Sequence, residues 1–125
     1  MESLLHLVPA ALAGMVSTAR AEPDAAHGKN LDTARCATCG SLEYNGVGPS
    51  HKELIGRRAG TAQGYSYSSA LKNSDVVWNA ASLPKWLIEP EQLIPGQKMF
   101  ISIPDAQERA DIVSWLLPAG RKQQP

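Results

Sequence analysis

The sequence is poor in aromatic residues, carries no net charge and lacks an apolar run long enough to cross a membrane. Its 125 residues include three tryptophans, three tyrosines and one phenylalanine. A chain of this length forms one domain. With so few aromatic side chains, it either packs economically or fills its centre with something else. A formal net charge of zero leaves no broad basic surface for nucleic acid and no acidic tail.

The most extended apolar segment, Leu4–Val16, lies near the N-terminus and is too short to span a bilayer. Ala19-Arg20-Ala21 follows it with the small-x-small pattern of a signal-peptidase site. We therefore expect residues 1–21 to be a cleaved signal peptide, a mature start near Glu22 and an exported, periplasmic protein without a membrane span. Glu2 stands where such signals usually carry a basic residue, so an ordinary amphipathic helix is the alternative.

After Glu22, short helical patterns alternate with long loops rich in glycine and proline. No segment shows a convincing strand pattern, so the sequence predicts an all-α domain over residues 22–120 and a disordered tail over 121–125. So little regular structure usually requires a metal, a disulfide or a cofactor for stability. The expected helices run from a cap at Asn30 or Asp32 toward Cys39, over Ser68–Asn73, from Ser82 to Pro90 and from Asp105 to Pro118.

Cys36 and Cys39 are the only cysteines, and they are spaced Cys-Ala-Thr-Cys. In an exported chain this pair has four interpretations: haem attachment, a thiol–disulfide redox motif, half of a zinc site, or a small disulfide. Zinc is disfavoured because the three histidines show no ligand spacing. A thioredoxin-like motif lacks its preceding strand, and haem attachment lacks the following histidine because position 40 is glycine. The local motif leaves the choice open.

Pieces spread over the rest of the chain resemble the class I cytochromes c in order and spacing. No single piece is specific, but together they cover almost all of the expected mature chain. They are Gly28-Lys29, Cys36 and Cys39, Gly48-Pro49, Gly56-Arg57, the run from Gly64 to Ser68, Trp78, Leu83, Trp86-Leu87, Pro90, Ile94 to Met99, Arg109-Ala110-Asp111 and Trp115-Leu116.

The resemblance implies a small cytochrome c fold of few helices with long loops around one haem c. Cys36 and Cys39 would form thioethers to the haem, and Met99 would be the distal ligand of the iron. Three further positions, Arg57, Tyr67 and Trp78, match residues around a buried haem propionate. The remaining matches are Gln97, where the family usually has threonine, Pro49, whose carbonyl usually orients the proximal histidine, and the pocket or core residues Tyr65, Leu83, Trp86, Leu87 and Leu93.

The implied function is periplasmic electron transfer by a monomer that is not an enzyme. Redox partners would dock at the exposed haem edge, with Lys52, Lys72 and Lys98 as possible docking charges. Scattered lysines are also common on any solvated surface.

Three positions depart from the family pattern. Gly40 replaces the proximal histidine, Asp32 replaces an aromatic residue of the first helix, and His51 replaces a leucine. His51 is a possible substitute ligand of the iron, although a lone histidine in a polar run is usually a solvated loop residue. His27 is a weaker candidate. The resemblance therefore leaves three hypotheses: an electron carrier with an altered proximal site, a haem-free module with a Cys36–Cys39 disulfide, or a haem protein with an open iron position that binds small ligands.

Overall fold

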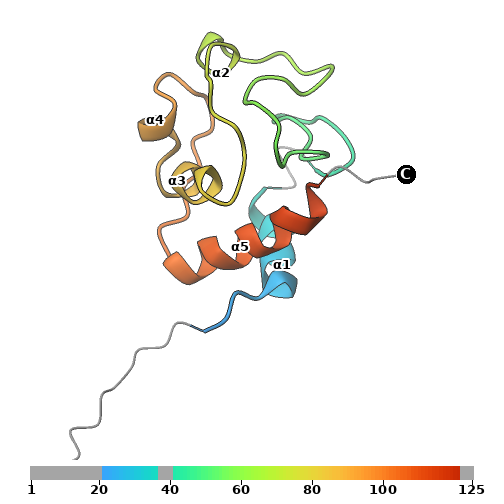
Figure 1. Ribbon diagram of the computed structural model, residues 1–125, viewed down its shortest axis with the longest axis vertical. Helices are drawn as coiled ribbons and strands as arrows, with labels where there is room; N and C mark the ends of the chain where they lie inside the picture. The colour runs from blue at the N-terminus through green and yellow to red at the C-terminus, as the bar shows by residue number, and fades with distance from the viewer. Residues whose placement is uncertain (1–20, 37–40, 122–125) are drawn as a thin grey trace, which may run out of the picture.

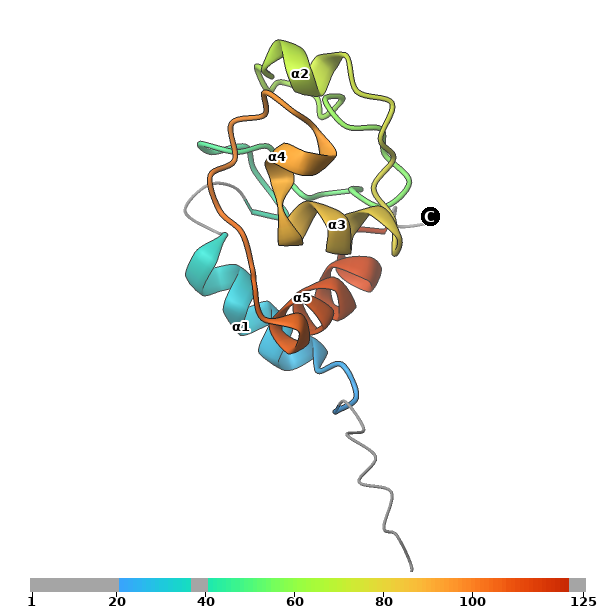
Figure 2. The same cartoon turned by 90° about the vertical axis from the view of Figure 1, so that its left-hand side faces the viewer.

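The computed structural model describes residues 21–36 and 41–121, which form helices joined by long loops (Figure 1). The loop-rich segment before α2 lies to one side of the helices, and α2 lies at the end of the molecule opposite α1 and α5 (Figure 2). The helices are α1 (Ala25–Arg35), α2 (Ser69–Lys72), α3 (Ser82–Ile88), α4 (Pro90–Leu93) and α5 (Ala106–Ala119).

The first and last helices cross each other, and this crossing forms one end of the molecule (Figures 1 and 2). Gly28 of α1 is buried at the crossing. A Cβ atom at this position would lie 1.9 Å from the carbonyl oxygen of Asp111 in α5. Only glycine therefore allows the two backbones to approach this closely.

The predicted start of the first helix is wrong. The helix begins at Ala25 because the Asp24 side chain caps it by accepting a hydrogen bond from the His27 backbone N–H. Asn30 and Asp32, the two expected caps, lie inside α1, and Asp32 is buried in its last turn. The part of this prediction that extended toward Cys39 falls outside the described residues.

The other helical predictions are largely correct because their capping signals are local. Ser68 caps α2, and Asp105 caps α5 by accepting from the Glu108 N–H. Ser82 is the first residue of α3 rather than its cap, and its hydroxyl donates to the carbonyl of Val77. Pro118 lies within the last turn of α5, which ends at Ala119 and is followed by the C-cap residue Gly120.

The sequence did not predict α4, a single turn that begins at Pro90 immediately after α3 ends. Proline is favoured at the start of a helix because its fixed φ and missing N–H cost nothing there. α3 packs against both α4 and α5. The buried core that these helices share with the loops consists of Leu54, Ala59, Trp78, Leu83, Leu87, Ile94, Ile103, Ile112, Val113 and Leu116.

Regular strands are absent from residues 21–36 and 41–121, where only an isolated bridge joins Arg58 and Val77. Within those same residues, no helix has the length and apolar character needed to cross a bilayer. The fold therefore positions its loops through helix packing and individual hydrogen bonds.

Candidate functional site

Cys36 lies at the C-terminal end of α1, where its backbone N–H donates to the Asp32 carbonyl over 2.8 Å. The side chain is half-buried. The last turn of α1 therefore fixes the position of the first cysteine. Cys39 and Gly40, the other two residues of the motif, lie outside the described residues.

The loop that carries Met99 is tied to α4 by one carboxylate. Glu91 accepts from the Gly96 backbone N–H at 2.8 Å and from the Gln97 side-chain amide at 3.2 Å. Gln97 is 6% exposed, and its side-chain oxygen accepts from the Met99 backbone N–H. Met99 is half-buried, whereas the next residue, Phe100, is 91% exposed. The loop thus holds the thioether side chain partly inside the protein.

Glu91 is a functional residue that sequence reasoning missed. The signal was present, because Pro90 followed by Glu91 is a typical helix start with an acidic residue in the first turn. Its role depends on how the loop folds back onto α4, which no local pattern encodes.

The structure brings Arg57, Tyr67 and Trp78 to the same region. The Trp78 backbone N–H donates to the Arg57 carbonyl at 3.0 Å. The Arg57 guanidinium donates to the backbone carbonyls of Lys52 and Ser50. Burial lowers the pKa of Arg57. Burial also raises the pKa of Tyr67, against the effect of the Ala62 N–H on its hydroxyl oxygen and of the nearby Arg57. These groups form a partly buried polar cluster next to the buried indole of Trp78.

Four of the five expected pocket or core residues pack in the core or against it. Leu83 and Leu87 are buried, while Trp86 and Leu93 pack on the core from its edge. Trp86 also meets Trp78 edge to face, with 5.1 Å between ring centroids. Tyr65 instead packs on Tyr67 at the loop surface, and its hydroxyl donates to the carbonyl of Val47.

Pro49 is half-buried in the loop that leads to His51. The His51 backbone N–H donates to the Ser41 carbonyl at 2.8 Å. Its ring is 24% exposed, so His51 is not the solvated loop residue that its polar neighbours suggested.

His51 faces Asp32, with 4.0 Å between Nδ1 and the Asp32 Oδ1. Both atoms are buried, and neither has a hydrogen-bond partner within the described part of the chain. Burial lowers the pKa of His51, while Asp32 opposes this shift and Arg57 adds to it. Burial thus favours the neutral form of the His51 imidazole beside the buried side chain of Asp32.

His27 has a different environment. Its Nδ1 pairs with the buried Asp111 carboxylate at 2.7 Å, and this hydrogen bond raises the pKa of His27. Asp111 also accepts from the Asp24 backbone N–H at 2.8 Å. His27 thus joins α1 to α5.

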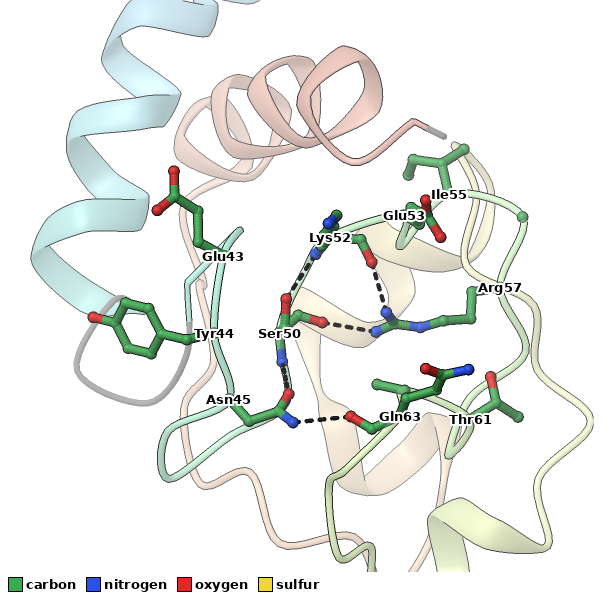
Figure 3. Close-up of a pocket in the computed structure, with 12 residues that line it drawn as sticks. Glu43, Tyr44, Asn45, Ser50, Lys52, Glu53, Ile55, Arg57, Thr61 and Gln63 are labelled. Carbon is green, nitrogen blue, oxygen red and sulfur yellow. Dashed lines mark hydrogen bonds between the residues drawn. The ribbon is translucent and has the colours of Figure 1, made fainter. Parts of the chain in front are cut away.

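Two hollows lie close to these groups. The larger, of about 580 Å³, is open and polar, and the hydrogen bonds among Asn45, Ser50, Lys52, Arg57 and Gln63 hold its walls (Figure 3). Its polar lining does not suit an apolar ligand. The smaller, of about 250 Å³, is lined by Asp32 and Trp115. The Trp115 indole N–H is also buried and lacks a partner among residues 21–36 and 41–121.

The possible docking lysines, Lys52, Lys72 and Lys98, are exposed on three separate loop or helix segments. Groups of three or more histidine, cysteine, aspartate or glutamate side chains that would bind a metal ion are absent from the described residues.

No family model matches the chain. It is 39% identical to a cytochrome c2 of Rhodomicrobium vannielii over 82 residues, 65% of this chain and 66% of that protein. It is 38% identical to a cytochrome c of Guizotia abyssinica over 97 residues, 74% of this chain and 87% of that protein. A cytochrome c2 of Rhodoblastus acidophilus is 38% identical over 76% of this chain and 90% of its own length.

Among solved structures, cytochrome cH from Methylobacterium extorquens is similar, with a TM-score of 0.70 and 42% identity. The match covers 74% of this chain and 96% of that one. This likeness confirms the small all-α cytochrome c fold that the spaced motifs predicted. The chain belongs to the class I c-type cytochromes.

Proposed function

We propose that this chain is an exported electron-transfer protein that carries one c-type haem with an altered proximal side. The haem would supply a single iron that exchanges one electron between its ferrous and ferric states. Everything else in the function depends on how the chain holds that group and limits access to it.

The donor set fits the family's cofactor on the distal side. The Met99 thioether would ligate the iron, and the carboxylate of Glu91 together with the buried Gln97 would keep its loop in place. A methionine sulfur favours the reduced state and raises the potential. These hydrogen bonds of Glu91 and Gln97, which we call the Glu91 clamp, are the single observation that carries the proposal. They hold the backbone at Met99, a half-buried residue between two exposed neighbours.

The remaining residues would attach and surround the haem. The Sγ atoms of Cys36 and Cys39 would add to the two vinyl groups, and each thiol hydrogen would pass to a vinyl carbon, so the addition consumes no oxidant. Arg57 and Tyr67 would neutralise and bind a propionate. Trp78 would complete that side with a buried ring.

The proximal side is where this chain differs from its family, since Gly40 supplies no ligand atom. Export follows from the signal pattern of residues 1–21 and would place the mature protein in the periplasm. A monomer would meet its redox partners at the exposed haem edge, near exposed Lys98 and Phe100.

The test is to express the full chain with the c-type attachment machinery, and to record its mass and its spectra in both oxidation states. We expect a mature chain starting near Glu22 with the added mass of one haem, and a spectrum that titrates reversibly with one electron. A chain without haem but with oxidised cysteines would overturn the proposal and favour the disulfide-bonded module. A haem adduct with a high-spin reduced spectrum would favour the open iron site instead.

A second variant measures how much the proximal change matters for attachment. Gly40→His restores the complete Cys-x-x-Cys-His motif, so we expect a several-fold rise in the fraction of chains that carry haem. An unchanged fraction would show that the glycine does not limit attachment.

A further inference from the structure

Two of the three departures from the family pattern meet in the folded chain. Asp32 lies in the last turn of α1, and His51 lies 19 positions later in the loop. The resemblance expects an aromatic residue at the first position and leucine at the second. In place of two apolar side chains, the structure has a carboxylate and an imidazole, with 4.0 Å between the Asp32 Oδ1 and the His51 Nδ1.

Burying these two polar side chains without hydrogen-bond partners in the described part of the chain destabilises the fold, so a functional role would account for their presence. A buried polar group without a hydrogen-bond partner destabilises the folded state, and the Asp32 Oδ1 and His51 Nδ1 are both in this state among the described residues. A separation of 4.0 Å is too long for a direct hydrogen bond. A bridging water or a small rotation of either side chain brings the two groups together.

A backbone hydrogen bond ties His51 to the residue that follows position 40 in the chain. The His51 N–H donates to the carbonyl of Ser41, which directly follows Gly40 in the chain. The family's nitrogen ligand is missing at position 40 of the sequence, whereas His51 has a buried ring nitrogen, Nδ1, with no hydrogen-bond partner among the described residues.

The orientation of the ring suits a metal ligand. Histidines that ligate metals usually donate their other ring N–H to a carboxylate, which fixes the tautomer and makes the ligating nitrogen more basic. Nδ1 is 4.0 Å from the Asp32 Oδ1, and a proton held on Nδ1 by this carboxylate leaves the lone pair on Nε2. The other histidine among the described residues, His27, lies in the first turn of α1 and is 49% exposed, against 24% for His51.

We propose that His51 is the proximal nitrogen ligand of the haem iron, through Nε2, and that Asp32 is the positioning residue that orients its ring. This inference rests on the proposed function, since it needs a bound haem. It explains both polar substitutions with one role and assigns the chain two iron ligands, His51 and Met99.

The experiment compares four forms of the haem-loaded full chain: wild type, His51→Leu, His51→Gly and His27→Gln. Ferric electron paramagnetic resonance and ferrous visible spectra report the spin state and the axial ligands. We expect wild type and His27→Gln to be low-spin. His51→Leu restores the family residue and should keep haem, but as a high-spin species that binds carbon monoxide. Added imidazole should return His51→Gly to the low-spin spectrum.

Restoring the family ligand supplies a matched background. In Gly40→His, the His51→Leu substitution should leave the low-spin spectrum unchanged, because the iron no longer depends on position 51. A loss of the low-spin spectrum in this background as well would show that His51 acts through the fold.

Asp32→Asn tests the positioning role. The amide is similar in size but is a weaker hydrogen-bond acceptor for the ring N–H than the carboxylate. The imidazole therefore donates less electron density to iron. We expect the low-spin spectrum to remain and the reduction potential to shift to a higher value. An unchanged potential would remove Asp32 from the proposal.

The outcomes separate the two proposals. A wild-type chain that takes up no haem overturns the proposed function and this inference together. A low-spin spectrum that persists in His51→Leu overturns only the assignment of His51. A high-spin spectrum in haem-loaded wild type overturns that assignment and also favours the open iron site over the proposed electron carrier.

Discussion

Gly28 and Asp111 bring the backbones of α1 and α5 into direct contact, at a place where a single added methyl group would fall 1.9 Å from a carbonyl oxygen. The contact is backbone against backbone, so no flexible side chain can yield. The closeness of the first and last helices therefore depends on one residue.

We expect Gly28→Ala to lower the free energy of unfolding by about 3 kcal/mol, although alanine normally favours a helix over glycine by about 1 kcal/mol. Thermal unfolding followed by circular dichroism measures the change. The matched control is Asn30→Ala, an exposed position in the same helix, which should be neutral or slightly stabilising. A stability for Gly28→Ala equal to that of the control would contradict the close approach.

The His27–Asp111 pair makes stability depend on pH in two directions. Its hydrogen bond raises the pKa of His27 above 6.5, so the stabilisation is complete below pH 6.5 and is lost as pH rises through the higher folded-state pKa. The Asp24 N–H and the His27 hydrogen bond lower the pKa of Asp111 below 3.8. That contribution is complete above pH 3.8 and is lost as pH falls through the lower value.

The difference in unfolding free energy between wild type and His27→Gln should therefore be largest near pH 5, and should shrink toward both pH 9 and pH 2. Urea unfolding at a series of pH values gives this difference. Arg35→Gln, which removes the exposed ion pair with Glu108, is the control and should show no decline around neutral pH. A His27→Gln difference that stayed flat from pH 5 to 9 would argue against the pairing.

Removal of the Glu91 carboxylate should loosen the Met99 loop. Its hydrogen bonds to Gly96 and Gln97 are at a partly exposed site, where we assign them about 1 kcal/mol together. In the haem-loaded protein, Glu91→Ala should let imidazole displace the methionine about fivefold more readily. An imidazole titration of the ferric form measures this affinity, and exposed Glu89→Ala is the control. Equal imidazole affinities in the two variants would show that the Glu91 clamp does not keep Met99 on the iron.

Asp32→Phe restores the family's aromatic residue and should stabilise the fold. It removes a buried carboxylate and fills part of the hollow of about 250 Å³ beside Trp115, for a gain of about 1–3 kcal/mol. Chemical unfolding of the wild-type and Asp32→Phe proteins measures this gain in the free energy of unfolding. Asp32→Asn keeps the polar group and the hollow, so it should gain much less. A less stable Asp32→Phe would mean that the carboxylate is well satisfied.

The sequence predicted the fold class and most helix ends because both depend on local or repeated signals. Ser68 and Asp105 act as caps through residues three positions away, so a single sequence reveals them. The start of α1 was misplaced because three residues there are able to cap a helix. The choice of Asp24 depends on Asp111, 87 positions away, which accepts the Asp24 backbone N–H.

The candidate site was only partly readable for the same reason. The sequence singled out Asp32 and His51 as two separate departures, but no periodicity relates a helix to a loop 19 residues later. Their meeting depends on how the loop returns past the end of α1, tied by the bond from His51 to Ser41. Glu91 was missed because its partners lie in a loop that folds back by tertiary contact.

The crossing of α1 and α5 also has a consequence for the order of events during synthesis. In the sequence, nearly the whole domain lies between the start of α1 and the end of α5. The Ile55 backbone N–H also donates a hydrogen bond to the Gly120 carbonyl. A nascent chain cannot form this crossing before residue 119 has left the ribosome. Until then α1 has no last helix to pack on, so the contact between the two ends of the domain is among the last tertiary contacts to form.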